Sequence, residues 1–212
     1  MTEDLVAEDA KDAAPVKTAV AVLGTLAEFH QEPIAFDLDA LVDLVQQINP
    51  DLLCLDMTSE QWRARDFGDL PPEYREALLP LAYQTDIVVA PVGGDGPPPE
   101  PQAAGWRGML IGLVRGLLGW LQKSAPGLDA INSGWRHDWA NHLYDLTVKL
   151  GENDVRSAQA THRQRLIDNI VEIARRDPGA RILVVVNVRD CHHIRPALRT
   201  CEEIEVRSYT EL

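Results

Sequence analysis

The chain has 212 residues, of which 45% are hydrophobic and 25% are charged, as is ordinary for a soluble globular protein. This composition excludes a mainly disordered chain, a fibrous repeat and a small disulfide-stapled fold. The formal net charge of −13 argues against a nucleic-acid partner, which needs a basic surface. Three cysteines and the lack of a secretory pattern predict a cytoplasmic protein, and no stretch is apolar for long enough to predict a membrane span.

Residues 1–15 are rich in acids and alanine and show no periodicity, so we expect a disordered acidic tail. Residues 16–212 are expected to form a single α/β domain. Short, continuously apolar runs are typical of strands that are buried on both faces of a sheet. Such runs predict strands at 18–24, 52–56, 86–92, 181–187 and 203–207.

Apolar residues at helical spacing alternate with these strands. They predict helices at 37–48, 59–65, 72–79, 106–123, 136–150, 154–176 and 194–199. Strands that alternate with helices indicate a three-layer α/β fold, with a mostly parallel sheet of about five strands and helices on both faces. The segment 106–150 is then a helical excursion, inserted between the third and fourth strands.

Glycines recur every four residues in the helix predicted at 106–123, at Gly108, Gly112 and Gly116. This spacing puts them along one side of the helix, where another helix can approach closely. Three interpretations stay open, one of which is that the glycines form the wall of a ligand site. The glycines could form a crowded internal helix contact, which we favour, or they could form the seam of a homodimer.

Ligands of open α/β sheets bind beyond the carboxyl ends of the strands, and several polar residues follow the predicted strands. Glu28 and His30 come after the first strand, Asp56 ends the second, and His192 and His193 follow the fourth. Imidazole and carboxylate groups are common ligands of divalent metals and common acid–base catalysts. His30, Asp56 and His192 are the expected ligands of one divalent ion (Zn, Mn, Co or Fe). The alternative is that these polar groups only cap helices and pair charges.

A nucleotide cofactor is not expected. The chain has neither a Gly-x-Gly-x-x-Gly fingerprint after its first strand nor a Gly-Lys-Ser/Thr phosphate loop.

Two segments carry a resemblance to a known superfamily. The first runs AVLGTLAEFHQEP and continues through LDALVDLVQQINPDLLCLD, and the second is THRQRLIDNIVEIARRDPGARILVVVNVRDCHHI. Together they resemble the opening and closing units of the superfamily that holds TraB/PrgY, GumN, the TIKI proteins, ChaN and the erythromycin esterases. In that pattern a strand ending in Gly-Thr precedes a histidine, and a later helix carries an arginine before a valine-rich strand and a second histidine.

The resemblance implies functional positions where residues match. Gly24 and Thr25 match the first motif, and His30 and Asp56 stand for its histidine and the acid after the second strand. Arg163 matches the helix arginine, and His192 or His193 matches the closing histidine. The resemblance implies a metal-assisted or histidine-based hydrolase of a small molecule or peptide, acting in the cleft at the strand ends.

Two departures from the pattern support an alternative function. His30 comes six residues after Gly24 instead of three, and the closing motif lacks its glycine. The alternative is a catalytically degenerate member that binds a small ligand or a partner protein.

Overall fold

A computed structural model describes residues 16–27, 30 and 34–212 of the chain; Glu28 and the predicted acidic tail lie outside them. Five parallel strands form one sheet in the order β3-β2-β4-β1-β5. The strands are β1 (Thr18–Thr25), β2 (Leu52–Leu55), β3 (Val88–Pro91), β4 (Arg181–Asn187) and β5 (Ile204–Arg207). The three-layer α/β fold is therefore confirmed, and all five strands are parallel.

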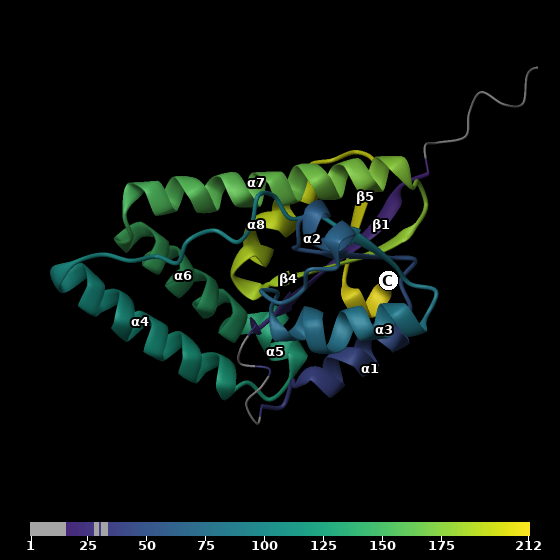
Figure 1. Cartoon of the computed structure of the whole chain (residues 1–212). Coiled ribbons are helices and arrows are strands. Elements are labelled where there is room, and N and C mark those ends of the chain that lie inside the picture. The colour runs from purple at the N-terminus through teal and green to yellow at the C-terminus, as the bar shows by residue number, and fades with distance from the viewer. Residues whose placement is uncertain (1–15, 28–29, 31–33) are drawn as a thin grey trace, which may run out of the picture.

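One face of the sheet is covered by α1 (Leu38–Ile48), by a π-helix at Glu73–Leu78 and by α3 (Leu79–Gln84), with α2 (Ser59–Ala64) outside them. The opposite face is covered by α7 (Asn153–Arg176) and α8 (Val188–Arg199). Figure 1 shows α7 on one side of the strands and α1 with α3 on the other. Side chains of β1 alternate between the two cores: Ala21 and Leu23 face α1, whereas Val20 and Val22 face α7 and α8.

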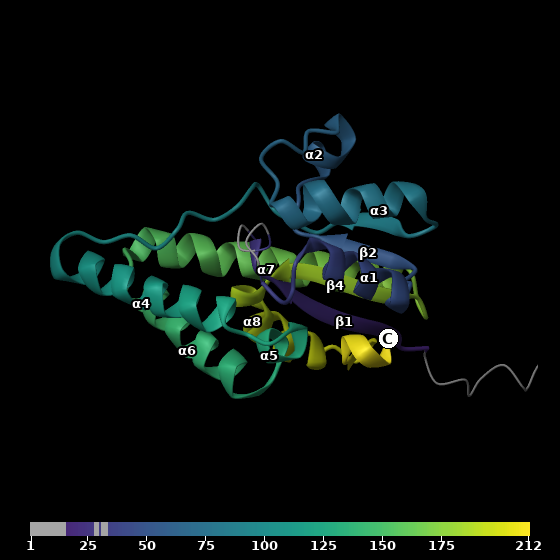
Figure 2. The ribbon, with the colours of Figure 1, turned by 90° about the horizontal axis from the view of Figure 1, so that it is seen from below.

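The excursion between β3 and β4 consists of α4 (Gly105–Lys123), α5 (Leu128–Asn132) and α6 (Gly134–Leu150). We call residues 105–150 the arm. Its two long helices pack on each other through a small apolar core of Val114, Leu118, Leu121, Ala140 and Leu143. Figure 2 shows that α4 and α6 extend away from the strands. The predicted helical excursion is confirmed.

The glycines of α4 do not form the internal contact that we favoured. A side chain at Gly108 would clash with the carbonyl oxygen of Ala103, but nothing lies within 4 Å of a Cβ built at Gly112 or Gly116. These two glycines are exposed. The homodimer seam stays a prediction, because the structure holds one chain.

The helix after β4 begins earlier than we predicted. The expected helix at 194–199 starts at Val188, where the Asn187 side chain caps it by accepting a hydrogen bond from the Arg189 backbone N–H. Arg189 to His193 therefore lie in the first turns of a helix and not in a loop. This difference fixes where His192 and His193 point.

The carboxyl end of β1 is held by a close approach to α8 and α5. A Cβ at Gly24 would lie 2.9 Å from the Val188 Cα and 3.0 Å from the Cys191 Sγ. The Gly24 backbone N–H donates to Asn132 Oδ1 at 2.7 Å, and the Asn132 amide donates back to the Gly24 carbonyl at 3.1 Å. Arg195 donates to Asn132 Oδ1 and to the Val22 carbonyl, both at 2.9 Å. These bonds tie the arm to the sheet.

Candidate functional site

A cavity of about 460 Å³ lies where the arm meets the carboxyl ends of β1 and β4. Leu26 and Ala27 reach it from β1, and Asn187, Arg189 and Asp190 reach it from β4. The connection after β1 runs through α1 on one face of the sheet, and the connection after β4 runs through α8 on the other. Two neighbouring strands with diverging connections create the crevice in which open α/β sheets bind ligands.

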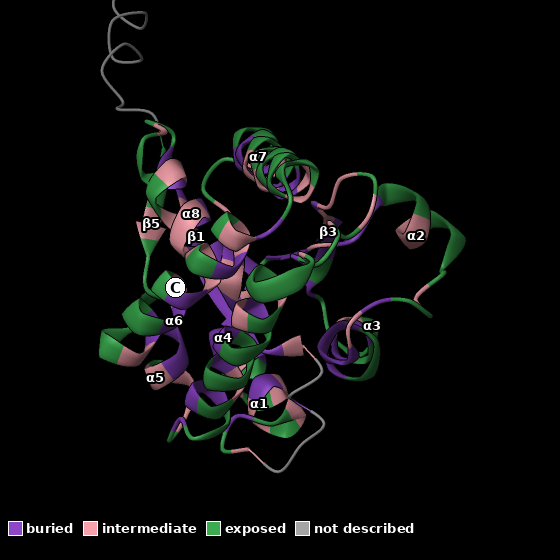
Figure 3. Ribbon diagram, turned by 90° about the vertical axis from the view of Figure 1, so that its left-hand side faces the viewer, coloured by how far each residue is buried: buried purple, intermediate pink, exposed green. Residues whose placement is uncertain are grey.

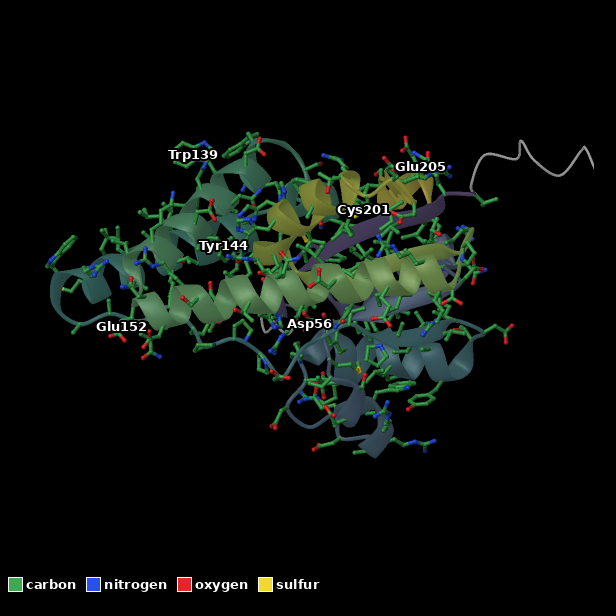
Figure 4. The ribbon with its side chains drawn as sticks, turned by 90° about the horizontal axis from the view of Figure 1, so that it is seen from above. Asp56, Trp139, Tyr144, Glu152, Cys201 and Glu205 are labelled. Carbon is green, nitrogen blue, oxygen red and sulfur yellow. The ribbon has the colours of Figure 1, made fainter. Side chains whose placement is uncertain are left out.

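The arm and α7 close the rest of the cavity. Its apolar wall is contributed by Leu118, Tyr144 and Val148, and its polar wall contains arginines, acids and amides. The polar lining side chains are Glu100, Arg115, Gln122, Asp145, Thr147, Gln159, Arg163, Asn187, Arg189, Asp190 and His192. Figure 4 labels Tyr144 on α6 and Asp56 beside α7. The cavity therefore has room for a small molecule and groups of both charges to orient it.

Three side chains converge at the cavity wall between α6 and α8. His192 Nε2 lies 3.1 Å and His193 Nε2 lies 3.4 Å from the same oxygen, Asp145 Oδ1. The two imidazole rings lie against each other, with centroids 3.9 Å apart. Among the described residues this is the one group of three whose ligand atoms all lie within 4.8 Å of one another.

The protonation states of Asp145 and His193 suit a metal. Burial, together with the neighbouring His192 and Arg163, lowers the pKa of His193 to about 4 although Asp145 opposes the shift, so its imidazole is neutral near pH 7. Burial opposes ionisation of Asp145, but its hydrogen bond to His192 and the two nearby imidazoles together lower the pKa of its carboxyl. One ionised carboxylate and neutral imidazole nitrogens are the donor set of a Zn²⁺ or Mn²⁺ site.

A set of three protein ligands fits a catalytic metal site better than a structural metal site. Structural zinc ions take four protein ligands, whereas catalytic ions keep a coordination position open to substrate or water. Asp145 and His192 both line the cavity, so the open position would face it. One feature is missing: His192 Nδ1 is buried and has no partner in the described part of the chain, whereas a ligating histidine usually donates from its second nitrogen.

A second polar group lies across the cavity. Glu100 accepts from Arg189 at 2.5 Å and from Arg115 at 3.1 Å, so it bridges the β3–α4 loop to α8 and α4. The Asp190 side chain lies 3.5 Å from Arg189 and is almost fully buried, and this burial raises the pKa of its carboxyl. Arg163 also lines the cavity, and its guanidinium makes no hydrogen bond or ion pair with the described residues. It is thus the cavity cation with the most freedom to meet a ligand.

Asp56, a predicted ligand, pairs elsewhere. Its Oδ2 lies 2.9 Å from Nε2 of His162 on α7, and the imidazole donates to the carboxylate. Burial opposes the charge on His162, but the hydrogen bond and the charge of Asp56 outweigh it and raise the pKa of His162 above 6.5. Neither residue lines the cavity, although the charges of Asp56 and Asp190 influence one another. The structure does not bring Asp56 to His192.

His30 is engaged by the backbone on both sides of its ring. Its Nε2 accepts from the Leu26 N–H at 3.0 Å, so Nδ1 carries the proton and donates to the Phe36 carbonyl at 2.8 Å. Burial lowers the pKa of this histidine. With both nitrogens occupied the ring has no lone pair for a metal, and it links Leu26 to Phe36. Glu28 lies outside the described residues.

Sequence reasoning missed two residues of this region, Asp145 and His162. Both lie in the middle of long helices that we expected to pack, far from any strand end. Asp145 becomes part of the candidate site only because the arm folds back against α8. His162 directly precedes Arg163, which was the sole signal in the chain that could have drawn attention to it.

In comparisons with known proteins, no family model, no curated protein and no solved structure matches the chain. The resemblance to the TraB and erythromycin-esterase superfamily therefore stays a prediction. Among the helices of the described residues, none combines the length and apolar character needed to cross a bilayer.

Proposed function

We propose that the chain is a metal-assisted hydrolase of a small molecule or peptide, with a divalent ion held by Asp145, His192 and His193. The observation that carries the proposal is the convergence of these three side chains on one point in the wall of a cavity at the sheet's carboxyl edge. A divalent ion at this point would supply Lewis-acid chemistry, polarising a carbonyl or phosphoryl oxygen and lowering the pKa of a water molecule.

The remaining cavity residues have separate roles in this proposal. Arg163, whose guanidinium makes no hydrogen bond or ion pair with the described residues, holds an anionic group of the substrate or the negative charge that develops in the transition state. Asp190, whose pKa is raised by burial, donates or accepts a proton at the opposite wall. Leu118, Tyr144 and Val148 bind the apolar part of the substrate.

The test is hydrolysis of ester, phosphate-monoester and peptide substrates by protein that has been stripped with a chelator and then reloaded with Zn²⁺, Mn²⁺, Co²⁺ or Fe²⁺. We expect activity only after reloading. The variant His193→Asn removes a ligand and should lower activity by more than about a hundredfold, since loss of outer-shell partners alone costs 10- to 100-fold. Arg163→Met should also lower activity, with Arg163→Lys retaining part of it.

The matched control is His142→Asn, because His142 is an exposed histidine on the same helix as Asp145. It should leave activity unchanged. Activity that survives both the chelator and His193→Asn would contradict the metal mechanism.

One observation favours a second candidate, a non-catalytic protein that binds a small anion. The free guanidinium of Arg163 can bind such a ligand with or without a metal, and Asp145 already has two imidazole partners. Metal-independent binding of an anionic ligand that Arg163→Met abolishes, without hydrolysis, would support this second function.

A further inference from the structure

The arm carries an unusual share of the exposed apolar side chains. Of the eleven large hydrophobic residues exposed among the described part of the chain, eight belong to α4 and α6. They are Trp106, Met109, Leu113, Leu117, Trp120, Trp135, Trp139 and Leu146. Four of the five tryptophans of the chain are in this set.

On α4 these residues form one continuous stripe. Trp106, Met109, Leu113, Leu117 and Trp120 are separated by three or four positions, which places them on the same side of the helix. The opposite side, with Val114 and Leu118, packs on α6. We call the five exposed residues the outer stripe. In Figure 3, where the left-hand end of the molecule faces the viewer, much of α4 is coloured as exposed.

A helix that is apolar on both sides is normally covered on both sides. The outer stripe is a contiguous row of exposed apolar side chains and not a scatter of single ones, and contiguous apolar patches mark interaction sites. Gly112 and Gly116 lie beside it with open space around them. One face of α4 is therefore apolar, yet no described part of the chain packs on it.

The charge of the arm indicates what covers it. Residues 105–150 contain five basic and three acidic side chains, which is a net charge of +2. Since the whole chain has a net charge of −13, the other residues together carry −15. On α4 itself there are three basic residues and no acid. Arg115 pairs with Glu100 and Arg107 bonds the Lys149 carbonyl, so both side chains are held by neighbouring residues and neither belongs to the outer stripe.

We propose that the outer stripe docks α4 on an anionic lipid surface, with the helix lying in the plane of the interface. Amphipathic helices of this kind combine an apolar face containing tryptophan with basic residues and a lack of acids. Tryptophan is enriched where membrane meets water, and Trp106 and Trp120 stand at the two ends of the stripe. Charge complementarity favours this surface over a second copy, since pairing two arms would bring like charges together.

Docking of this kind would orient the molecule. The strongly acidic remainder is repelled by an anionic bilayer, whereas the arm is attracted to it. The arm would then lie on the lipid, with the sheet away from it. The proposal does not depend on the function of the cavity.

The experiment is co-sedimentation of the full chain with vesicles of phosphatidylcholine alone and of an equimolar mixture of phosphatidylcholine and phosphatidylglycerol. The tested variant is Leu113→Asp. Its matched control is Val16→Asp, because Leu113 and Val16 are each 70% exposed and the change in charge is the same. Tryptophan fluorescence follows binding directly, since four of the five indoles are on the arm.

We expect binding to the mixed vesicles, weaker binding at high salt, and a blue shift of the tryptophan emission. Leu113→Asp should lower the partition coefficient by about tenfold or more, since it removes a leucine that the lipid would bury and adds a negative charge. Val16→Asp should bind like the original chain.

Failure of the original chain to bind the mixed vesicles would overturn the proposal, as would equal binding by Leu113→Asp. Light scattering, which measures the molar mass in solution, tests whether a second copy of the chain covers the outer stripe. A dimer that Leu113→Asp converts to a monomer, together with no vesicle binding, would assign the stripe to a second copy of the chain.

Discussion

His162 donates from Nε2 to Asp56 Oδ2 at 2.9 Å, and this bond ties the middle of α7 to the carboxyl end of β2. His162 is 6% exposed, so the bond is formed largely out of water. It therefore stabilises one protonation state of the histidine, and the stability of the fold should depend on pH.

The first prediction is that His162→Gln destabilises the protein by about 2 kcal/mol at pH 6, the usual contribution of a hydrogen bond to a charged group. The native pKa of His162 is raised above the unfolded value of 6.5. Its contribution is therefore fully present below pH 6.5 and is lost as the pH rises through the native pKa. Urea unfolding at pH 6 and pH 9 should show a smaller difference between variant and original at pH 9. The exposed His142→Gln should show no such trend, and a constant difference for His162→Gln would contradict the account.

A second buried group predicts a pH dependence in the same direction, in a range that starts at lower pH. Glu73, in the π-helix, is 1% exposed; Thr25 lies 2.8 Å from its Oε1, and its Oε2 has no partner among the described residues. Burial raises the pKa of Glu73 above 4.5, although hydrogen bonds from Thr25 and the backbone oppose the shift. The native state thus binds the proton more tightly, and its stability falls as the pH rises above 4.5 toward the native pKa.

Glu73→Gln keeps the shape of the neutral acid and removes the burial of a charge. We expect its free energy of unfolding at pH 7, measured with urea, to be about 1 kcal/mol higher than that of the original chain. This difference should shrink toward pH 4. A variant that is less stable than the original at pH 7 would show that the ionised carboxyl has a partner that this account lacks.

Two glycines offer a matched comparison. Gly24→Ala would bring a methyl group within 3.0 Å of α8 and of Asn132, so we expect a loss of about 1–3 kcal/mol. Gly112→Ala meets nothing within 4 Å and lies inside a helix, so we expect a gain of about 0.5–1 kcal/mol. Denaturant unfolding measures both. A loss of stability at Gly112 would mean that its face is packed in solution.

The sheet was predictable from sequence because parallel strands covered on both faces need continuous apolar runs. The strand predicted at 181–187 has the bounds of β4, and the strand predicted at 18–24 is one residue shorter than β1. The strand order was not predictable, since every buried run is compatible with several neighbours. The start of α8 was missed because the capping side chain of Asn187 falls inside a run that reads as strand.

The site was predictable only in part, because it depends on contacts between distant helices. The position of His192 and His193 after β4 marked the correct edge of the sheet. The partner of these histidines is Asp145 on α6, which precedes His192 by 47 residues in the sequence. No local sequence pattern indicates this pairing. His30 illustrates the reverse case: a histidine after a strand whose two ring nitrogens are used by the backbone.

The measurement that tests the central claim most directly is equilibrium dialysis of the chelator-stripped protein against Zn²⁺ and Mn²⁺, followed by elemental analysis. The account predicts about one ion per chain for the original and for His142→Asn, and loss of that ion in His193→Asn. It also predicts stabilisation by the metal in the original and in His142→Asn but not in His193→Asn, by about 2.7 kcal/mol at a hundredfold excess over Kd. Metal-free protein after dialysis, or an ion that His193→Asn retains, would contradict the assignment of Asp145, His192 and His193 as a metal site.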